Sequence, residues 1–205
     1  MKDYVIIAIC GGSASGKSFI SQELYKRNSK DIILISQDDY YKSFEELTIK
    51  EKKLINYDHP NAFDVDLLIK DLINLKNGDS IDYPIYSFQQ YKRIGTKQIE
   101  PKSIILLEGM LVLHYPEIRN IIDKSIYIDC PEKIRFKRML KRDVRERGKT
   151  LEVLNEQYNR YVRPMHEKFV EPQKQYANII IDGSKAQNVV YKSVENFLEK
   201  SNILK

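Results

Sequence analysis

No stretch of this chain approaches the roughly 20 apolar residues that a membrane-spanning helix requires, so no membrane association is expected. The sequence holds only 2 cysteines. Neither Cys10 nor Cys130 belongs to a Cys-x-x-Cys pair, which favours two buried thiols at strand ends. Internal repeats, low-complexity tracts and Gly/Ser-rich linkers are also missing. We therefore expect residues 1–205 to form one domain.

The opening residues also predict no secretory signal. The opening residues MKDYVIIAIC have no small-residue cleavage site after them and run directly into a glycine-rich loop. They predict a buried strand, and a cytoplasmic enzyme is expected.

Positive charge is unevenly distributed along the chain. The whole sequence has a net charge of +5, whereas residues 132–149 alone combine nine lysines and arginines with three acidic residues. A segment this basic indicates an anionic partner or a solvated helix face. Because the charges form a single short cluster, binding to RNA or DNA is not expected.

Short runs rich in isoleucine and valine recur along the chain. Runs of this length are typical of strands buried on both faces of a parallel sheet. Helical patterns separate them, and one opens with Asp64 as a candidate N-cap. The alternation predicts an α/β fold, a doubly wound parallel sheet with right-handed crossovers. The expected strands are 4–9, 32–36, 103–108, 125–129 and 178–182, and the expected helices are 17–27, 64–76, 150–162 and 186–200.

Residues 80–101 interrupt this alternation. Two β-like arms flank the sequence Lys-Arg-Ile-Gly-Thr at 92–96, and Pro84 and Pro101 argue against a helix. We expect a β-hairpin that projects from the sheet and turns at 92–96.

The letters GGSASGKS match the phosphate-binding pattern G-x-x-x-x-G-K-[ST] in full. Gly11 and Gly16 permit backbone angles that turn successive N–H groups toward phosphate oxygens. Lys17 is expected to reach the β- and γ-phosphates, and Ser18 to offer its hydroxyl to Mg²⁺ at the positive end of the next helix. The predicted nucleotide-binding residues are Gly11, Gly12, Ser13, Ala14, Ser15, Gly16, Lys17 and Ser18.

This phosphate-binding loop (P-loop) does not by itself name a function. A GTPase would need an N/T-K-x-D guanine motif, which this sequence lacks. A motor or helicase is normally larger. A small phosphoryl-transfer enzyme or a nucleotide-dependent regulator remains.

Two carboxylates follow predicted strands, where the ligand crevice of an open α/β sheet lies. Asp38 is the candidate that orients an acceptor hydroxyl and takes its proton, and Glu108 is the candidate partner of Mg²⁺. Capping a turn or helix is the alternative role of each. Arg142 and Arg147, in the basic segment, could neutralise charge on the transferred phosphoryl group and exclude water.

Further motifs run along nearly the whole chain, and together they resemble the uridine–cytidine kinases of the phosphoribulokinase/uridine kinase group of P-loop kinases. The resemblance implies ATP-dependent phosphorylation of uridine and/or cytidine at the 5′-hydroxyl, with Mg²⁺, giving UMP or CMP and ADP in pyrimidine salvage. It also implies a hairpin that helps form the nucleoside pocket, a helical lid at 132–165, and a homotetramer. The motifs are GGSASGKS, SQDDYY, NYDHPNAFD, PIYSF, LLEG, KRDVRERGK and QYNRYVRPMHEKFVEPQKQYANIII.

The resemblance also assigns roles by position. Asp38 matches the catalytic aspartate, and Asp58 matches a carboxylate that binds the ribose 2′- and 3′-hydroxyls. One carboxylate can accept from both hydroxyls of such a diol. A turn-forming role is the alternative for Asp58. The remaining matches are Ser18 and Glu108 with Asp38 for magnesium, Lys17 for catalysis, Tyr57, Tyr86 and Gln157 around the nucleoside, and Arg142 and Arg147 in the lid.

Three positions depart from the family pattern. Tyr91 stands where many members have a histidine that reads the base edge, which puts the preference between uracil and cytosine in doubt. Met139 replaces the second of two adjacent arginines, and Lys149 replaces an arginine on the substrate side, so a bidentate donor is lost at each position.

Two alternatives therefore stay open beside a nucleoside kinase. One is a related P-loop kinase that phosphorylates another small hydroxyl compound, and the other is a catalytically weak nucleotide-binding regulator. The donor, ATP or GTP, also stays open.

Overall fold

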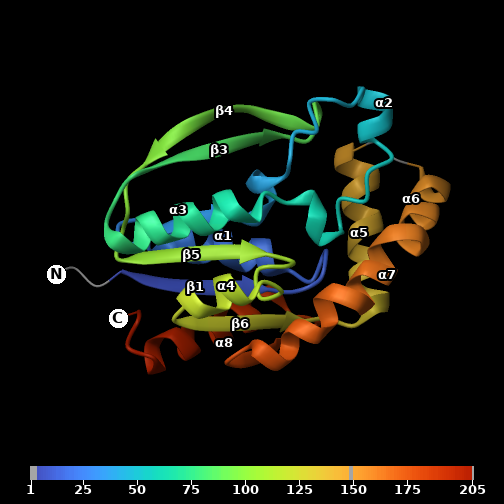
Figure 1. The fold of residues 1–205 in the computed structure, drawn as a ribbon. Coiled ribbons are helices and arrows are strands. Elements are labelled where there is room, and N and C mark those ends of the chain that lie inside the picture. Colours follow the sequence, from blue (N-terminus) through green and yellow to red (C-terminus); the bar gives the residue numbers. More distant parts are fainter. Residues whose placement is uncertain (1–3, 148–149, 205) are drawn as a thin grey trace.

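The computed structural model describes residues 4–147 and 150–204, and a five-stranded sheet in the order β2-β5-β1-β6-β7 forms its centre. All neighbouring strands in this sheet are parallel, as the sequence predicts (Figure 1). Each lies within a residue of its expected range. The strands are β1 (Val5–Cys10), β2 (Ile32–Ser36), β5 (Ile104–Gly109), β6 (Lys124–Asp129) and β7 (Ile179–Asp182).

Helices cover both faces of the sheet because its strands are apolar on both sides. Alternate side chains of β1 enter different cores, with Ile6 in one cluster and Ile7 in the other. The doubly wound α/β fold is thereby confirmed. Packed on the Ile6 side are α3 (Val65–Asn77) and α4 (Pro116–Ile121), and on the Ile7 side α1 (Lys17–Arg27) and α8 (Gln187–Lys200).

Capping side chains fix where two of the helices begin. At the start of α3, the Asp64 carboxylate accepts a hydrogen bond from Leu67 N at 3.2 Å, as its sequence position predicts. At the start of α6, the Thr150 hydroxyl accepts from Val153 N at 3.4 Å. Short polar side chains thus supply the acceptors that the first backbone N–H groups of a helix lack.

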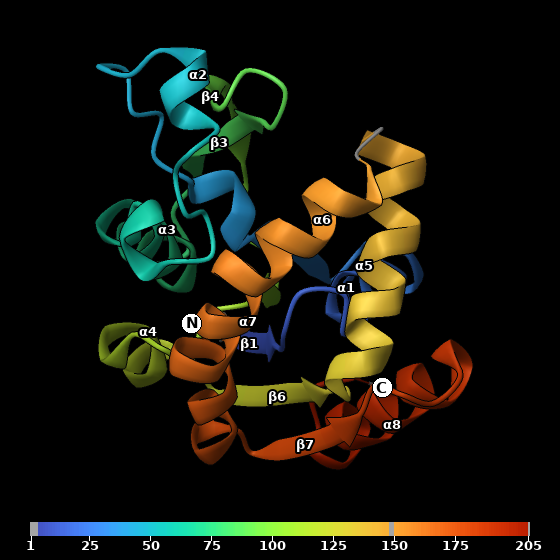
Figure 2. The same cartoon turned by 90° about the vertical axis from the view of Figure 1, so that its right-hand side faces the viewer.

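The basic segment folds as one long helix, and the chain returns through a succession of short helices. In Figure 2 the long helix stands on the right and the hairpin with α3 on the left, and the returning chain crosses from the right toward the left. These elements are α5 (Glu132–Arg147), α6 (Leu151–Gln157), η3 (Tyr158–Val162), α7 (Arg163–Met165), η4 (His166–Val170) and η5 (Glu171–Tyr176). Three short helices lie between β2 and α3, namely η1 (Gln37–Tyr40), α2 (Ile49–Lys52) and η2 (Pro60–Ala62).

The hairpin expected at 80–101 is present as an antiparallel pair outside the main sheet, β3 (Ile81–Ser87) with β4 (Lys92–Ile99). The prediction that the hairpin turns at 92–96 is wrong. Those residues begin β4, and the chain reverses at 88–91, where Tyr91 adopts a φ of +53°.

Arg93 accounts for the shifted turn. Its guanidinium donates to Asp64 Oδ2 at 3.0 Å and to the Tyr40 carbonyl at 3.2 Å. Its backbone N–H donates to Ser43 Oγ at 3.0 Å. These bonds hold Arg93 in the strand against the rest of the protein, so the reversal must come before it.

Both cysteines are buried and free, as expected: Cys10 ends β1, and Cys130 follows β6. In the part of the chain that the structure describes, no helix is both long enough and apolar enough to cross a membrane.

A buried glutamine joins the returning chain to the sheet. Gln173 is 1% exposed, and its Nε2 donates to the carbonyls of Met110 and Phe169, each at 2.8 Å. Its Oε1 accepts from Leu113 N at 2.9 Å and from Cys10 Sγ at 3.1 Å. One side-chain amide thus ties η5 to the segment after β5 and to the end of β1.

Replacing Gln173 with leucine should therefore destabilise the fold. The substitution removes the acceptor of Leu113 N and takes one donor from each of the Met110 and Phe169 carbonyls, which should lower the free energy of unfolding by roughly 3 kcal/mol in urea titrations. The matched control is Gln175→Leu, because Gln175 is exposed and its side chain donates to the Pro172 carbonyl at the surface. Equal losses in both variants would contradict the assigned role of Gln173.

Candidate active site

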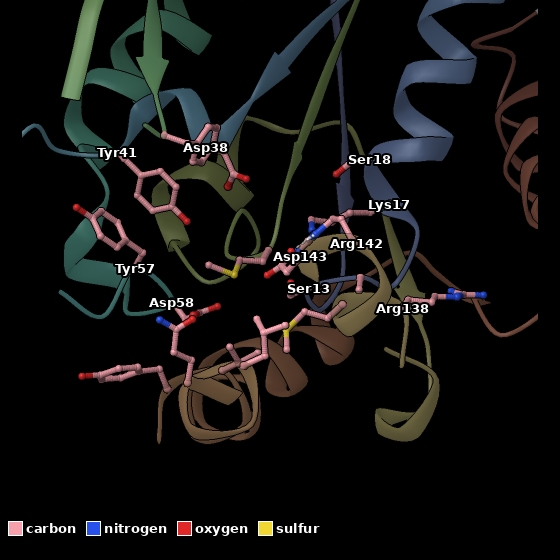
Figure 3. Close-up of a pocket in the computed structure, with 18 of the residues that line it drawn as sticks. Ser13, Lys17, Ser18, Asp38, Tyr41, Tyr57, Asp58, Arg138, Arg142 and Asp143 are labelled. Atoms are coloured by element: carbon pink, nitrogen blue, oxygen red, sulfur yellow. Dashed lines mark hydrogen bonds and ion pairs between the residues drawn. The ribbon is translucent and has the colours of Figure 1, made fainter. Parts of the chain in front are cut away.

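A cavity of about 860 Å³ lies where β1, β2 and β5 end, the edge at which open α/β sheets bind ligands. In Figure 3, Lys17 and Ser18 lie on the right, Tyr57 and Asp58 on the left, and Asp38 between them. The structure thus brings most of the expected site residues together. Those that line the cavity are Ser13, Ala14, Gly16, Lys17, Ser18, Asp38, Tyr57, Asp58, Tyr86, Tyr91, Arg142 and Gln157.

The P-loop joins β1 to α1, as its pattern requires. Gly11 has a φ of +152°, and a Cβ there would lie 2.6 Å from the Ile128 carbonyl oxygen. Gly16 has a φ of +105° immediately before α1. A side chain at Gly12 would lie 2.8 Å from the His166 ring. Three residues of the P-loop therefore pack against the protein interior and do not line the cavity, namely Gly11, Gly12 and Ser15.

Glu108 reaches the cavity through Ser18. Its carboxylate accepts from Ser18 Oγ at 3.2 Å and from Ser36 Oγ at 3.1 Å. Burial raises the pKa of Glu108, with the nearby Asp38 charge adding to the effect, while the ammonium of Lys17 acts in the opposite direction. The expected alternative, a helix cap, does not hold, because Glu108 lies within β5 and its carboxylate accepts from these two hydroxyls instead.

These oxygen atoms suit a hard divalent cation. Mg²⁺ takes oxygen ligands, keeps several waters, and usually needs only one or two protein carboxylates beside substrate phosphates. The Ser18 hydroxyl and the Glu108 carboxylate are adjacent at the P-loop, and Asp38 lines the same cavity. The residues present therefore fit the group, with the phosphates left to supply the remaining ligands.

Asp38 lies on η1, the short helix that directly follows β2. It is half-buried, and it lines the cavity rather than the outer surface. Its neighbour Asp39 instead accepts a hydrogen bond from Tyr83 on the hairpin. The two adjacent aspartates thus have different surroundings, which their sequence alone does not distinguish.

Tyrosines form the wall on the side away from the P-loop. The rings of Tyr57 and Tyr91 are 5.8 Å apart, and those of Tyr41 and Tyr86 are 5.4 Å apart. Burial raises the pKa of Tyr86, and the neighbouring Tyr57 side chain adds to this effect. Both hydroxyls therefore stay protonated at neutral pH and remain able to donate. Asp58 lies next to this wall in Figure 3.

The long helix α5 closes the cavity on a third side. Arg142 donates from Nε to Asp143 Oδ1 at 2.7 Å, and Met139, at the position where an arginine is expected, is 4% exposed. Arg138 donates to the carbonyls of Ser15 at 3.2 Å and Gly183 at 2.9 Å, so this helix is fastened to the P-loop. The side chain of Arg147 and all of Lys149 lie outside the described residues.

Several lining residues were missed in the sequence. Arg138 and Asp143 lie in the basic segment, where the sequence does not show which charged side chains face the cavity. Only the helical spacing of residues could have indicated which of them share one face. Tyr41 stands in the motif SQDDYY, which gave the only available signal. The missed residues include Tyr41, Phe88, Met110, Arg138, Asp143 and Tyr161.

Comparison with known proteins places this site in a family. A model described as "Phosphoribulokinase / Uridine kinase family" matches residues 6–190. The chain belongs to this family. It is 42% identical over 203 residues to a uridine kinase from Clostridium tetani, which covers 96% of this chain and 97% of that protein. It is 45% identical over 179 residues to a uridine kinase from Halalkalibacterium halodurans, covering 86% and 85%.

Solved structures of other kinases share the fold of this family member. A phosphoribulokinase from Rhodobacter spheroides matches with a TM-score of 0.67 at 14% identity, over 90% of this chain and 74% of that chain. A possible uridine kinase from Bacillus stearothermophilus matches with a TM-score of 0.61 at 16% identity, over 89% and 90%. The P-loop kinase fold is thereby confirmed.

The packing of the P-loop leads to a test of nucleotide binding. A Cβ at position 11 would clash with the Ile128 backbone and would strain a left-handed φ, so Gly11→Ala should weaken ATP binding at least about ten-fold. Gly95→Ala is the matched control, because nothing lies within 4 Å of a Cβ there. Equilibrium titration with ATP measures both. Unchanged affinity in Gly11→Ala would contradict the importance of this close approach.

Proposed function

We propose that this protein is a uridine kinase, which transfers the γ-phosphoryl group of ATP to the 5′-hydroxyl of uridine or cytidine. The observation that carries the proposal is a single cavity that contains the P-loop, Asp38 and the tyrosine wall beside Asp58. The relatives that are 42% and 45% identical and named uridine kinase support it. The products would be UMP or CMP and ADP, as in pyrimidine salvage.

In this proposal Asp38 acts on the acceptor hydroxyl. Its carboxylate orients the hydroxyl in line with the γ-phosphoryl group and accepts the proton as the new bond forms. Lys17 binds the β- and γ-phosphates, and Arg142 stabilises the charge on the transferred group. Ser18 and Glu108, with Asp38 in the same cavity, would hold Mg²⁺, which would supply positive charge against the phosphate oxygens.

The nucleoside occupies the side of the cavity away from the P-loop. Asp58 accepts hydrogen bonds from the ribose 2′- and 3′-hydroxyls, and Gln157 adds a polar contact. The base packs among Tyr57, Tyr86 and Tyr91, whose hydroxyls can both donate and accept. Because a tyrosine hydroxyl can pair with either polarity of the base edge, Tyr91 accommodates both uracil and cytosine, and the ratio of uridine to cytidine turnover reveals its role.

The rest of the chain is organised around this reaction. We propose that residues 1–205 work as one kinase domain, in which the segment 132–165 closes as a lid and excludes water. Arg147 and Lys149 belong to this lid. The proposal also includes ATP as the usual donor, a cytoplasmic location and a homotetramer, as the family resemblance implies.

The proposed reaction is tested by offering four acceptors separately with ATP and Mg²⁺: uridine, cytidine, adenosine and ribose. ADP release and mass spectrometry should reveal a pyrimidine monophosphate, with adenosine and ribose nearly unreactive. Asp38→Asn should lose turnover by about 100-fold or more while keeping ATP affinity, because only the general base is removed. ATP binding without any phosphorylated product would contradict the proposal and favour a regulator.

The role of Asp58 has its own test. Asp58→Ala should raise KM for uridine about ten-fold or more, because a buried diol loses its acceptor. For 2′-deoxyuridine the same change should matter less, since one of the two hydrogen bonds is already missing. Asp66→Ala, an exposed aspartate on α3, serves as the control. Equal effects on both nucleosides would contradict the assignment of Asp58 to the ribose diol.

A further inference from the structure

The hairpin carries a buried hydroxyl that bonds the turn after β2. Tyr83 on β3 is 5% exposed. Its hydroxyl donates to Asp39 Oδ2 at 2.5 Å and accepts from Ser36 N at 3.0 Å. Both the donor and the acceptor capacity of this oxygen are therefore used by the same short turn.

These two partners enclose Asp38 in the sequence. Ser36 is the last residue of β2, and Asp39 lies on η1 directly after Asp38. Ser36 also donates from Oγ to Glu108 Oε1 at 3.1 Å. The Tyr83 hydroxyl thus fixes the backbone before Asp38 and the side chain after it, next to the proposed magnesium ligand.

The same hairpin forms part of the nucleoside wall. Tyr86 lies on β3 and Tyr91 at the turn of the hairpin, and both line the cavity. Residues 83 and 86 would point to opposite faces of a regular strand. Both tyrosines are nevertheless buried, at 5% and 7% exposure, while Ile85 between them is 37% exposed. One strand therefore contacts both the nucleoside side and the Asp38 turn.

We propose that Tyr83 is a positioning residue for phosphoryl transfer, which aligns the Asp38 carboxylate by bonding Ser36 and Asp39 on either side of it. The proposal rests on the proposed function, since it requires Asp38 to act on the acceptor hydroxyl. It extends that function by making the hairpin responsible for the geometry of the general base as well as for nucleoside binding.

The chemistry of the hydroxyl fits a permanent role. Burial and the adjacent Asp39 charge raise the pKa of Tyr83, so the hydroxyl keeps its proton and continues to donate throughout the working pH range. The Tyr40 ring packs edge-on against the Tyr83 ring, with 5.8 Å between the ring centroids. The Lys97 ammonium lies over the Tyr83 ring, 5.1 Å from its centroid. Removal of the hydroxyl alone would leave this packing in place.

Tyr83→Phe is the direct test. We expect kcat for uridine to fall about ten-fold, with the Kd for ATP unchanged within about two-fold, because a misaligned base affects the transition state and not the donor. Asp39→Ala should give a similar loss, and the double variant should be no slower than either single variant. Tyr191→Phe is the matched control, since its buried hydroxyl bonds the Glu195 carboxylate on α8 at 2.9 Å.

A second background tells positioning apart from general destabilisation. If Tyr83 acts through Asp38, then Tyr83→Phe should slow the Asp38→Asn enzyme by less than about two-fold, although it slows the wild type about ten-fold. A ten-fold loss in both backgrounds would overturn the proposal. So would an unchanged kcat with a raised KM for uridine, because that pattern belongs to a binding residue.

Hydrogen exchange provides a readout independent of turnover. Amides of residues 34–41 should exchange faster in Tyr83→Phe than in the wild type or in Tyr191→Phe, since Ser36 N loses its acceptor. Unchanged exchange in this segment would overturn the proposal. Wild-type turnover is measured first, so a failed proposed function appears as an inactive wild type, whereas failure of the Tyr83 proposal appears as an active enzyme whose variant keeps its kcat.

Discussion

The close approach of the P-loop backbone to the end of β6 is the constraint on which the rest of the site depends. At Gly11 there is no space for a side chain, because the Ile128 carbonyl and the Ser15 hydroxyl occupy it. The loop is therefore held at a fixed depth below the cavity. The start of α1 follows from that position, and with it Lys17, Ser18 and the bond from Ser18 to Glu108. A triphosphate site of this kind requires backbone N–H groups fixed before the ligand arrives.

The other walls of the cavity, around the P-loop, come from distant parts of the chain. The segment after β2 brings Asp38, the hairpin brings its tyrosines, and α5 brings Arg142. Arg138 links α5 to the P-loop, while Gln173 links the returning chain to the end of β1. The cavity is thus made of separate elements, each fastened individually to the sheet edge.

The sequence predicted the parts of this structure that local chemistry decides. Continuous apolar runs gave the five parallel strands, and Asp64 gave the start of α3, because burial on both faces and N-capping leave direct signatures. The turn of the hairpin was placed wrongly because Arg93 is held in β4 by Asp64 and Tyr40, which are distant in sequence. For the same reason, the bond from Tyr83 to Asp39 could not be predicted from the letters SQDDYY, whereas Asp38 was expected in the cavity from its position after β2 and lines it.

The buried end of β1 has a consequence for the chemistry this protein tolerates. Cys10 immediately precedes the P-loop, where modification of a thiol would disturb phosphate binding. Burial raises its pKa to about 12, and its Sγ donates to the Gln173 side chain. Since the thiolate is the form that reacts with oxidants and alkylating agents, this thiol is almost inert at neutral pH. The P-loop therefore lies directly beside a thiol that oxidants and alkylating agents attack only slowly.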